Sequence, residues 1–163
     1  MQTANLESSE RKPPMHWKTI LVPTDLSERS KQAVKAATYL AEQCNAKITL
    51  LHVIQVYSGS FEGGAAADHF VNLAREYLDR MADEIPAELV GDKLVSFGPD
   101  GTFLKIVETA DAIASDLIVM ATHSYGPVKR ALFGSLATSV IRHAPCAVLV
   151  VSPHPPQMNQ STI

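Results

Sequence analysis

The sequence predicts an α/β fold, a single doubly wound open sheet of five parallel strands in the order 3-2-1-4-5, with helices on both faces. Three observations predict it. Short apolar runs recur along the chain, helical patterns fill the intervals between them, and the length of 163 residues suits one domain. Most of the runs are continuously hydrophobic, as expected for parallel strands that are covered on both faces.

The apolar runs are the predicted strands. They are TILVP (Thr19–Pro23), KITLLHV (Lys47–Val53), KLVSF (Lys93–Phe97), LIVMA (Leu117–Ala121) and AVLVV (Ala147–Val151). Because right-handed crossovers must place helices on both faces of the sheet, the winding direction has to reverse once, between the first and fourth strands. Ligands of open α/β sheets bind at this switch point, beyond the carboxyl ends of the diverging strands.

Apolar residues with helical spacing fill the intervals between the strands. The first helix should lie between Ser27, a candidate N-cap, and Asn45, a candidate stop, and the second should end before Pro86. The stripes are Ala33, Val34, Ala37, Leu40, Ala41 and Cys44; then Phe70, Leu73, Ala74, Tyr77, Leu78, Met81 and Ala82; then Phe103, Ile106, Val107, Ala110, Ile113 and Ala114; and last Leu136, Ala137, Val140 and Ile141.

One domain is expected over residues 16–152, with flexible polar tails at 1–15 and 153–163. The formal charge of −3 creates no global field that would favour nucleic acid or an anionic membrane. No apolar stretch suits a secretory signal or a membrane span, so the protein should be soluble and cytoplasmic.

Its two cysteines, Cys44 and Cys146, suit a reducing compartment and are expected to be small buried core residues.

The switch point predicts a functional surface made of PTDLS after the first strand and THSYGPVKRALFGS after the fourth. The second connection, Thr122 to Gly134, is longer than the ~4–6 residues usual for such loops, which indicates a role of its own. The helix that follows offers unpaired N–H groups and a positive dipole end to an anion. The Ser135 hydroxyl either caps this helix or donates to a phosphate, and Lys129 and Arg130 add positive charge.

Three more polar residues stand at strand ends, and each has two interpretations. Asp25 either accepts hydrogen bonds from ribose hydroxyls or caps the first helix together with Ser27. His52 and His123 end the second and fourth strands, where packing at the sheet rim is favoured over catalysis. Without an acidic partner nearby in the sequence, the two histidines are a weak metal signal.

The sequence contains none of the common catalytic templates. It has no GxxxxGK[ST] loop, no GxGxxG after the first strand and no GxSxG elbow. A nucleophilic pair of His143 and Cys146 is disfavoured because Cys146 leads into a buried strand. The sequence therefore predicts a binding site, with no catalytic residue assigned.

Two long blocks of the sequence carry a family resemblance. They are KTILVPTDLSERSKQAVKAATYLAEQCNAKITLLHV and DLIVMATHSYGPVKRALFGSLATSVIRHAPCAVLVV, within a match that extends from about Trp17 to Val151. Together they resemble the universal stress protein (UspA) family. The resemblance implies the five-stranded fold, a homodimer, and membership of either an ATP-binding or a non-ATP-binding group.

The ATP-binding group carries a glycine, two residues, a second glycine, nine residues, then glycine and serine or threonine. The matching positions here are Ala121, Ser124, Gly134 and Ser135, so the first two glycines are replaced. The resemblance implies that ATP or another adenine nucleotide is bound, with Mg²⁺ held by the phosphates. Its implied base and ribose contacts are Pro23, Thr24, Asp25 and Val53. Its implied phosphate and ribose contacts are Ala121, Ser124, Gly134, Ser135 and Leu136.

The effect of the replaced glycines depends on what they supply. If they permit a positive φ, each replacement costs about 1 kcal/mol. If they only allow close approach, the methyl group of Ala121 is a small intrusion and the Ser124 hydroxyl can add a hydrogen bond. Backbone N–H donors survive in both cases, and Gly126 can restore flexibility.

The fifth strand, Ala147–Val151, lacks a charge or proline although it should lie at a sheet edge. Such an edge invites a partner strand, and the resemblance implies a homodimer paired through this strand. The leading hypothesis is an adenine-nucleotide-binding protein that acts in stress response as a dimer. The alternative is a dimeric interaction module of the non-ATP-binding group with a vestigial crevice. Slow ATP hydrolysis has no identifiable base to support it.

Overall fold

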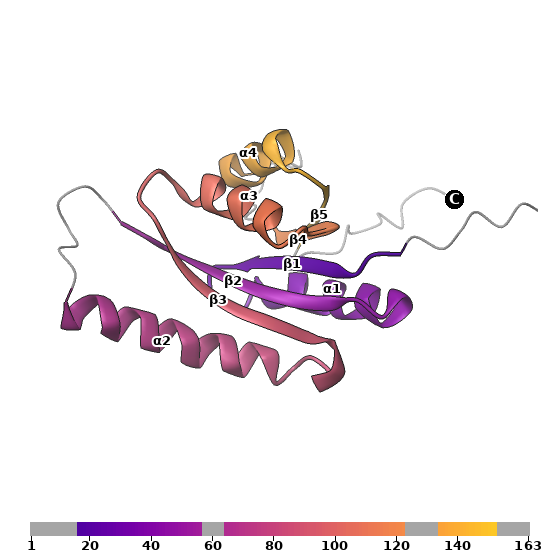
Figure 1. Ribbon diagram of the computed structural model, residues 1–163, viewed down its shortest axis with the longest axis horizontal. Coiled ribbons are helices and arrows are strands. Elements are labelled where there is room, and N and C mark those ends of the chain that lie inside the picture. Colours follow the sequence, from indigo (N-terminus) through magenta and orange to yellow (C-terminus); the bar gives the residue numbers. More distant parts are fainter. Residues whose placement is uncertain (1–15, 57–63, 123–133, 153–163) are drawn as a thin grey trace, which may run out of the picture.

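The computed structural model describes residues 16–56, 64–122 and 134–152. Five parallel strands form one sheet in the order β3-β2-β1-β4-β5, which confirms the predicted topology (Figure 1). The strands are β1 (Thr19–Thr24), β2 (Lys47–Gln55), β3 (Val90–Gly98), β4 (Leu117–Ala121) and β5 (Ala147–Val151). The helices are α1 (Lys31–Cys44), α2 (Ala65–Ala82), α3 (Thr102–Ala112) and α4 (Ser135–His143), with a 3-10 turn η1 at Ala87–Leu89.

Helices α1 and α2 cover one face of the sheet, and α3 and α4 cover the other (Figure 1). Successive strand residues point to opposite faces, so Ile20 packs into the first layer and Leu21 into the second. Both side chains are completely buried. A strand that is covered on both faces reads as a continuous apolar run, as β4 does, whereas β3 at the edge of the sheet contains the exposed Asp92 and Lys93.

Three strands are longer than the sequence predicted, β1 by the single residue Thr24. β3 begins at Val90, which pairs with Ile48, rather than at Lys93, and Gly91 and Asp92 lie at a register shift between these pairs although neither residue favours strands. β2 continues past Val53 to Gln55, which pairs with Gly98 of β3. The extension of β2 carries Gln55 to the edge of the sheet where the switch point lies.

The predicted N-cap of α1 is wrong. The helix begins at Lys31, and Ser30 occupies the N-cap position. Ser27 instead belongs to a turn after β1, where its backbone N and its Oγ donate to Asp25 Oδ1 at 3.0 and 2.6 Å. The predicted stop at Asn45 is confirmed, since Asn45 adopts the left-handed conformation that commonly ends helices.

Helix α2 has a wider apolar stripe than its buried face. Ala74, Leu78, Met81 and Ala82 are buried as predicted, and the helix ends before Pro86. In contrast, Phe70, Leu73 and Tyr77 are 48, 39 and 40% exposed. Within the described part of the chain, no helix is both long enough and apolar enough to cross a membrane.

The two cysteines are free thiols that are partly rather than fully buried, which corrects the prediction. Cys44 packs against the core on the α1 side, and Cys146 against the core on the α4 side. Partial burial raises the pKa of the Cys146 thiol above its usual value. That shift disfavours the thiolate that a nucleophile would require.

Candidate functional site

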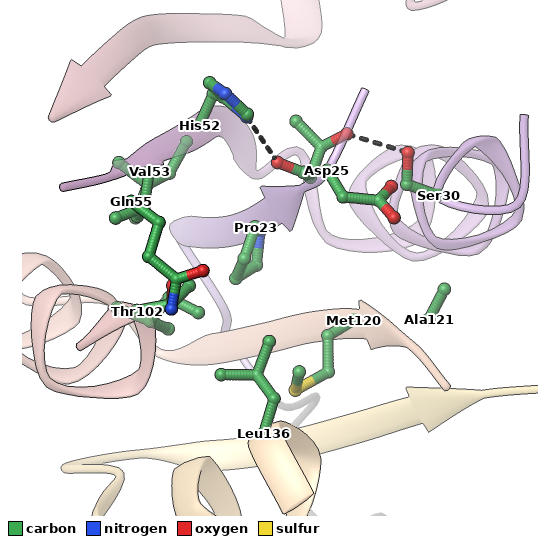
Figure 2. A pocket seen from close by; sticks show the side chains of 13 residues that line it. Pro23, Asp25, Ser30, His52, Val53, Gln55, Thr102, Met120, Ala121 and Leu136 are labelled. Atoms are coloured by element: carbon green, nitrogen blue, oxygen red, sulfur yellow. Dashed lines mark hydrogen bonds between the residues drawn. The ribbon is translucent and has the colours of Figure 1, made fainter. Parts of the chain in front are cut away.

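A cavity of about 240 Å³ opens at the carboxyl ends of β1, β2 and β4, at the switch point (Figure 2). Its lining is mainly apolar and comes from strands and from α3 and α4. The apolar lining residues are Pro23, Leu51, Val53, Ile106, Met120, Ala121 and Leu136, and the polar ones are Thr24, Asp25, Ser30, His52, Gln55 and Thr102. A mainly apolar cleft with a few polar groups is the usual form of a small-ligand site.

The hydroxyl groups of Thr24 and Ser30 stabilise the turn after β1. Thr24 Oγ1 accepts a hydrogen bond from the Leu26 backbone N at 2.9 Å and lies 2.7 Å from Ser30 Oγ. Ser30 Oγ donates to the Ser27 carbonyl at 2.7 Å, so in the pair with Thr24 it is the acceptor. Thr24 and Ser30 are both buried, and their hydrogen bonds stabilise the turn in which Leu26 has a left-handed backbone (φ 64°).

The same turn holds Asp25 at the rim of the cavity (Figure 2). Its Oδ1 accepts hydrogen bonds from Ser27, and its side chain is exposed. The alternative that Asp25 caps α1 is wrong, because α1 begins only at Lys31 and has no side-chain cap bond. An exposed carboxylate on a braced turn can accept further hydrogen bonds from a ligand's hydroxyl groups.

His52 ties the end of β2 to the end of β1. Its Nδ1 lies 2.9 Å from the Thr24 carbonyl oxygen, which can only accept, so Nδ1 carries the proton. The ring is partly buried at the sheet rim, as the sequence favoured. His52 thereby fixes the strand end from which the Asp25 turn departs.

The β4 end of the cavity contains the first replaced glycine position, Ala121. Ala121 is the last residue of β4, pairs with Val151 and is not among the described residues with a positive φ. An alanine therefore suits this backbone. The family's glycine at this position is not needed here for a positive φ, which leaves close approach as its role. Ser124, together with His123, Gly126, Lys129 and Arg130, lies outside the described residues.

Helix α4 begins beside the cavity, to which it contributes Leu136. Gly134 occupies the N-cap, and Ser135 is the first helical residue and is exposed, so of the two alternatives for Ser135, the one in which it caps the helix is wrong. The hydroxyl of Thr122, directly after β4, is buried and has no hydrogen-bond partner in the part of the chain that the structure describes. Hydroxyl groups therefore stand directly after β4, in Thr122, and at the start of α4, in Ser135.

Four of the polar lining residues were not predicted as site residues: Ser30, His52, Gln55 and Thr102. Gln55 shares the alternation of Leu51 and Val53, so a longer predicted strand would have included it. His143 and Cys146 have other contacts: His143 donates to the Ser139 carbonyl and packs against Phe103, and Cys146 packs against the core on the α4 side. Among the described residues, no cluster of three or more His, Cys, Asp or Glu could hold a metal.

The fold and the cavity together define the class of protein: a doubly wound α/β domain with a ligand-sized pocket at its switch point. The sequence profile of the universal stress protein family matches residues 16–152, and the chain belongs to that family.

Known proteins with similar sequences or structures agree with this assignment. A Staphylococcus aureus (strain USA300) chain that carries the universal stress protein name is 30% identical over 143 residues, 83% of this chain and 84% of that one. A universal stress protein solved in complex with cAMP has a TM-score of 0.60 at 24% identity, over 85% of this chain and 99% of its own. An Archaeoglobus fulgidus family member in complex with dAMP has a TM-score of 0.63 at 22% identity, over 83% and 98%.

Proposed function

We propose that this protein binds an adenine nucleotide, ATP or a monophosphate, at the switch-point cavity and acts in stress response through its bound state. The observation that carries the proposal is the cavity itself. Apolar walls suited to a base lie between an exposed carboxylate, Asp25, and the start of a helix, α4. Its volume of about 240 Å³ is near the lower bound of ~300 Å³ for small-ligand sites.

The residues present fit the parts of a nucleotide. We assign the base and ribose to Pro23, Thr24, Asp25 and Val53, and the phosphates and the adjoining ribose to Ala121, Ser124, Gly134, Ser135 and Leu136. Asp25 would accept from ribose hydroxyls, and the first N–H groups of α4 would donate to phosphate oxygens. A Mg²⁺ ion would be held by the phosphates.

The backbone at Ala121 favours retained binding. Because Ala121 is extended and paired with β5, its methyl group imposes no left-handed strain on the chain. The nucleotides in the titles of two related structures, cAMP and dAMP, support an adenine ligand for this chain as well.

Binding can be tested directly on the purified protein. Mass spectrometry of the small molecules released on denaturation should detect an adenine nucleotide, or calorimetry should detect ATP binding. Gly134→Val should abolish this binding, because a branched side chain at the N-cap crowds the first N–H groups of α4. Absence of binding at millimolar ATP would contradict the proposal.

We also propose a homodimer in which the β5 edges of two copies pair. β5 is an edge strand without charge or proline, and Leu149 on it is 37% exposed. Leu149→Lys should convert the dimer to a monomer in light scattering, whereas Gln43→Lys on the exposed side of α1 should not. A dimer that survives Leu149→Lys would contradict this pairing.

One observation favours the alternative, an interaction module with a vestigial crevice. Phe70, Leu73 and Tyr77 form an exposed apolar row on α2, remote in sequence from the cavity residues. Such a module should show neither co-purified nucleotide nor thermal stabilisation by ATP. Thermal melts with and without ATP therefore separate the two functions.

A further inference from the structure

One end of the cavity carries a polar side chain to which the assignments above give no role. Gln55 stands at the end of β2, and Thr102 at the start of α3 lines the same cavity. We propose that Gln55 selects an adenine base over a guanine base. The inference rests on the proposed nucleotide binding and adds the residue that determines the base specificity.

The strand alternation places Gln55 beside the assigned base contact. Val53 and Gln55 lie on the same face of β2, and they pair with Ser96 and Gly98 of β3. Shortly after Gly98 the chain enters α3 at Thr102, which brings α3 to this end of the cavity. Figure 2 shows Gln55 and Thr102 at one end, with Asp25 and Ala121 toward the other.

This arrangement orients the nucleotide. With the phosphates near α4 and Ala121, and with the ribose against Asp25, the base extends toward Val53 and Gln55. Leu51, Ile106 and Met120 line the cavity and can flank the faces of the base. The edge of the base then meets the side chains at the end of β2.

Three further polar side chains of the cavity hold its walls in place. Thr24 and Ser30 brace the turn after β1, and His52 Nδ1 donates to the Thr24 carbonyl. Gln55 is exposed at the cavity rim, and its amide combines donors with an acceptor in one plane. It is thus suited to recognise a base edge that presents both kinds of group.

The chemistry of that amide discriminates between purines. Adenine presents an N6–H donor beside the N7 acceptor, and a glutamine amide can satisfy both at once. Guanine presents two acceptors there, O6 and N7, so the amide oxygen would face the O6 lone pairs. A matched pair of this kind is worth about tenfold or more in affinity.

The test is calorimetric titration of AMP and GMP into the wild-type protein, Gln55→Leu, Gln55→Glu and the control Gln43→Leu. Because both ligands carry the same phosphate, the ratio of their affinities isolates the base. The wild type and Gln43→Leu should prefer AMP by about tenfold. Both Gln55 variants should lose most of this preference through weaker AMP binding, since glutamate keeps the size of glutamine but cannot donate to N7.

The outcomes separate this inference from the function on which it rests. A wild type that binds neither nucleotide at millimolar concentration overturns the nucleotide-binding proposal. A wild type that prefers AMP, together with a Gln55→Glu variant of unchanged preference, overturns the role of Gln55 alone. Thermal melts confirm that each variant is folded before its titration is interpreted.

Discussion

Polar residues have different roles at the two ends of the parallel strands, which we call the amino edge and the carboxyl edge of the sheet. At the amino edge, Asp116 Oδ2 accepts hydrogen bonds from the backbone N–H groups of Lys18 and Thr19 at 2.7 and 3.0 Å. At the carboxyl edge, Asp25 Oδ1 accepts from the backbone N and the Oγ of Ser27, two residues along the same turn, and the side chain lies at the cavity rim. One carboxylate joins distant segments, and the other is displayed by a local turn.

The difference follows from the topology. At the amino edge, β1 and β4 begin side by side, and Asp116 N donates to the Thr19 carbonyl at 2.9 Å. Ser115 Oγ adds bonds to the Thr19 and Leu117 carbonyls. Beyond the carboxyl edge, β1 is followed by α1 on one face of the sheet and β4 by α4 on the other, and the cavity opens between them. Asp116 therefore binds the backbone of a neighbouring strand, whereas Asp25 stands at the rim of the cavity.

The largest expected effect is the loss of stability in Asp116→Ala. The substitution removes a charged acceptor from two backbone N–H groups and should lower the free energy of unfolding by about 2 kcal/mol. Affinity for AMP should not change, because Asp116 does not line the cavity. Urea denaturation and calorimetry measure the two quantities. An unchanged unfolding midpoint would show that this carboxylate does not hold β1 and β4 together.

Asp25→Ala should produce the opposite pattern. Loss of the carboxylate at the rim should weaken AMP binding by about tenfold, roughly 1.4 kcal/mol, through the lost ribose contact. The free energy of unfolding should change by no more than about 0.5 kcal/mol, because the side chain is exposed and its bonds with Ser27 are local. If Asp25→Ala destabilised the protein as much as Asp116→Ala, the contrast between the edges would fail.

Gly98→Ala tests how tightly the carboxyl edge is built. A Cβ at position 98 would lie 2.8 Å from Val53 Cγ1, so Val53 must move within the cavity wall. We expect about 1 kcal/mol of destabilisation and a smaller, about threefold, loss of AMP affinity. The double variant with Val53→Ala should recover stability relative to the sum of the single variants, since it removes the clashing methyl groups. Strict additivity would argue against this contact.

Much of the fold follows from local sequence patterns. Continuous apolar runs such as Leu117–Ala121 identified the strands, and the left-handed Asn45 ended α1 as predicted. The start of α1 was missed because Ser27 bonds to Asp25 instead of capping the helix. Sequence propensity cannot choose between these two uses of a serine, because both are short-range hydrogen bonds of similar strength.

The candidate site was predicted in outline. The position of the cavity followed from the strand order, because the switch point depends only on topology. Gln55 was not predicted, since Gln55 has no apolar signal that would extend β2 to it. Its place in the strand depends on pairing with Gly98, a contact between residues far apart in the sequence.

The sequence by itself determined the strand order, the two helical layers and the family, because apolar periodicity and the quoted blocks are local properties of the chain. Only the tertiary structure decided that Ala121 is extended, that Asp25 is displayed while Asp116 is tied to the backbone, and that Gln55 joins the cavity. The states of Ala121, Asp116 and Gln55 depend on pairing or hydrogen bonds between residues distant in the sequence, whereas the Asp25 turn is local and gains its place at the cavity from the strands around it. Such contacts form only when the strands pair, so residue type and spacing alone do not specify them.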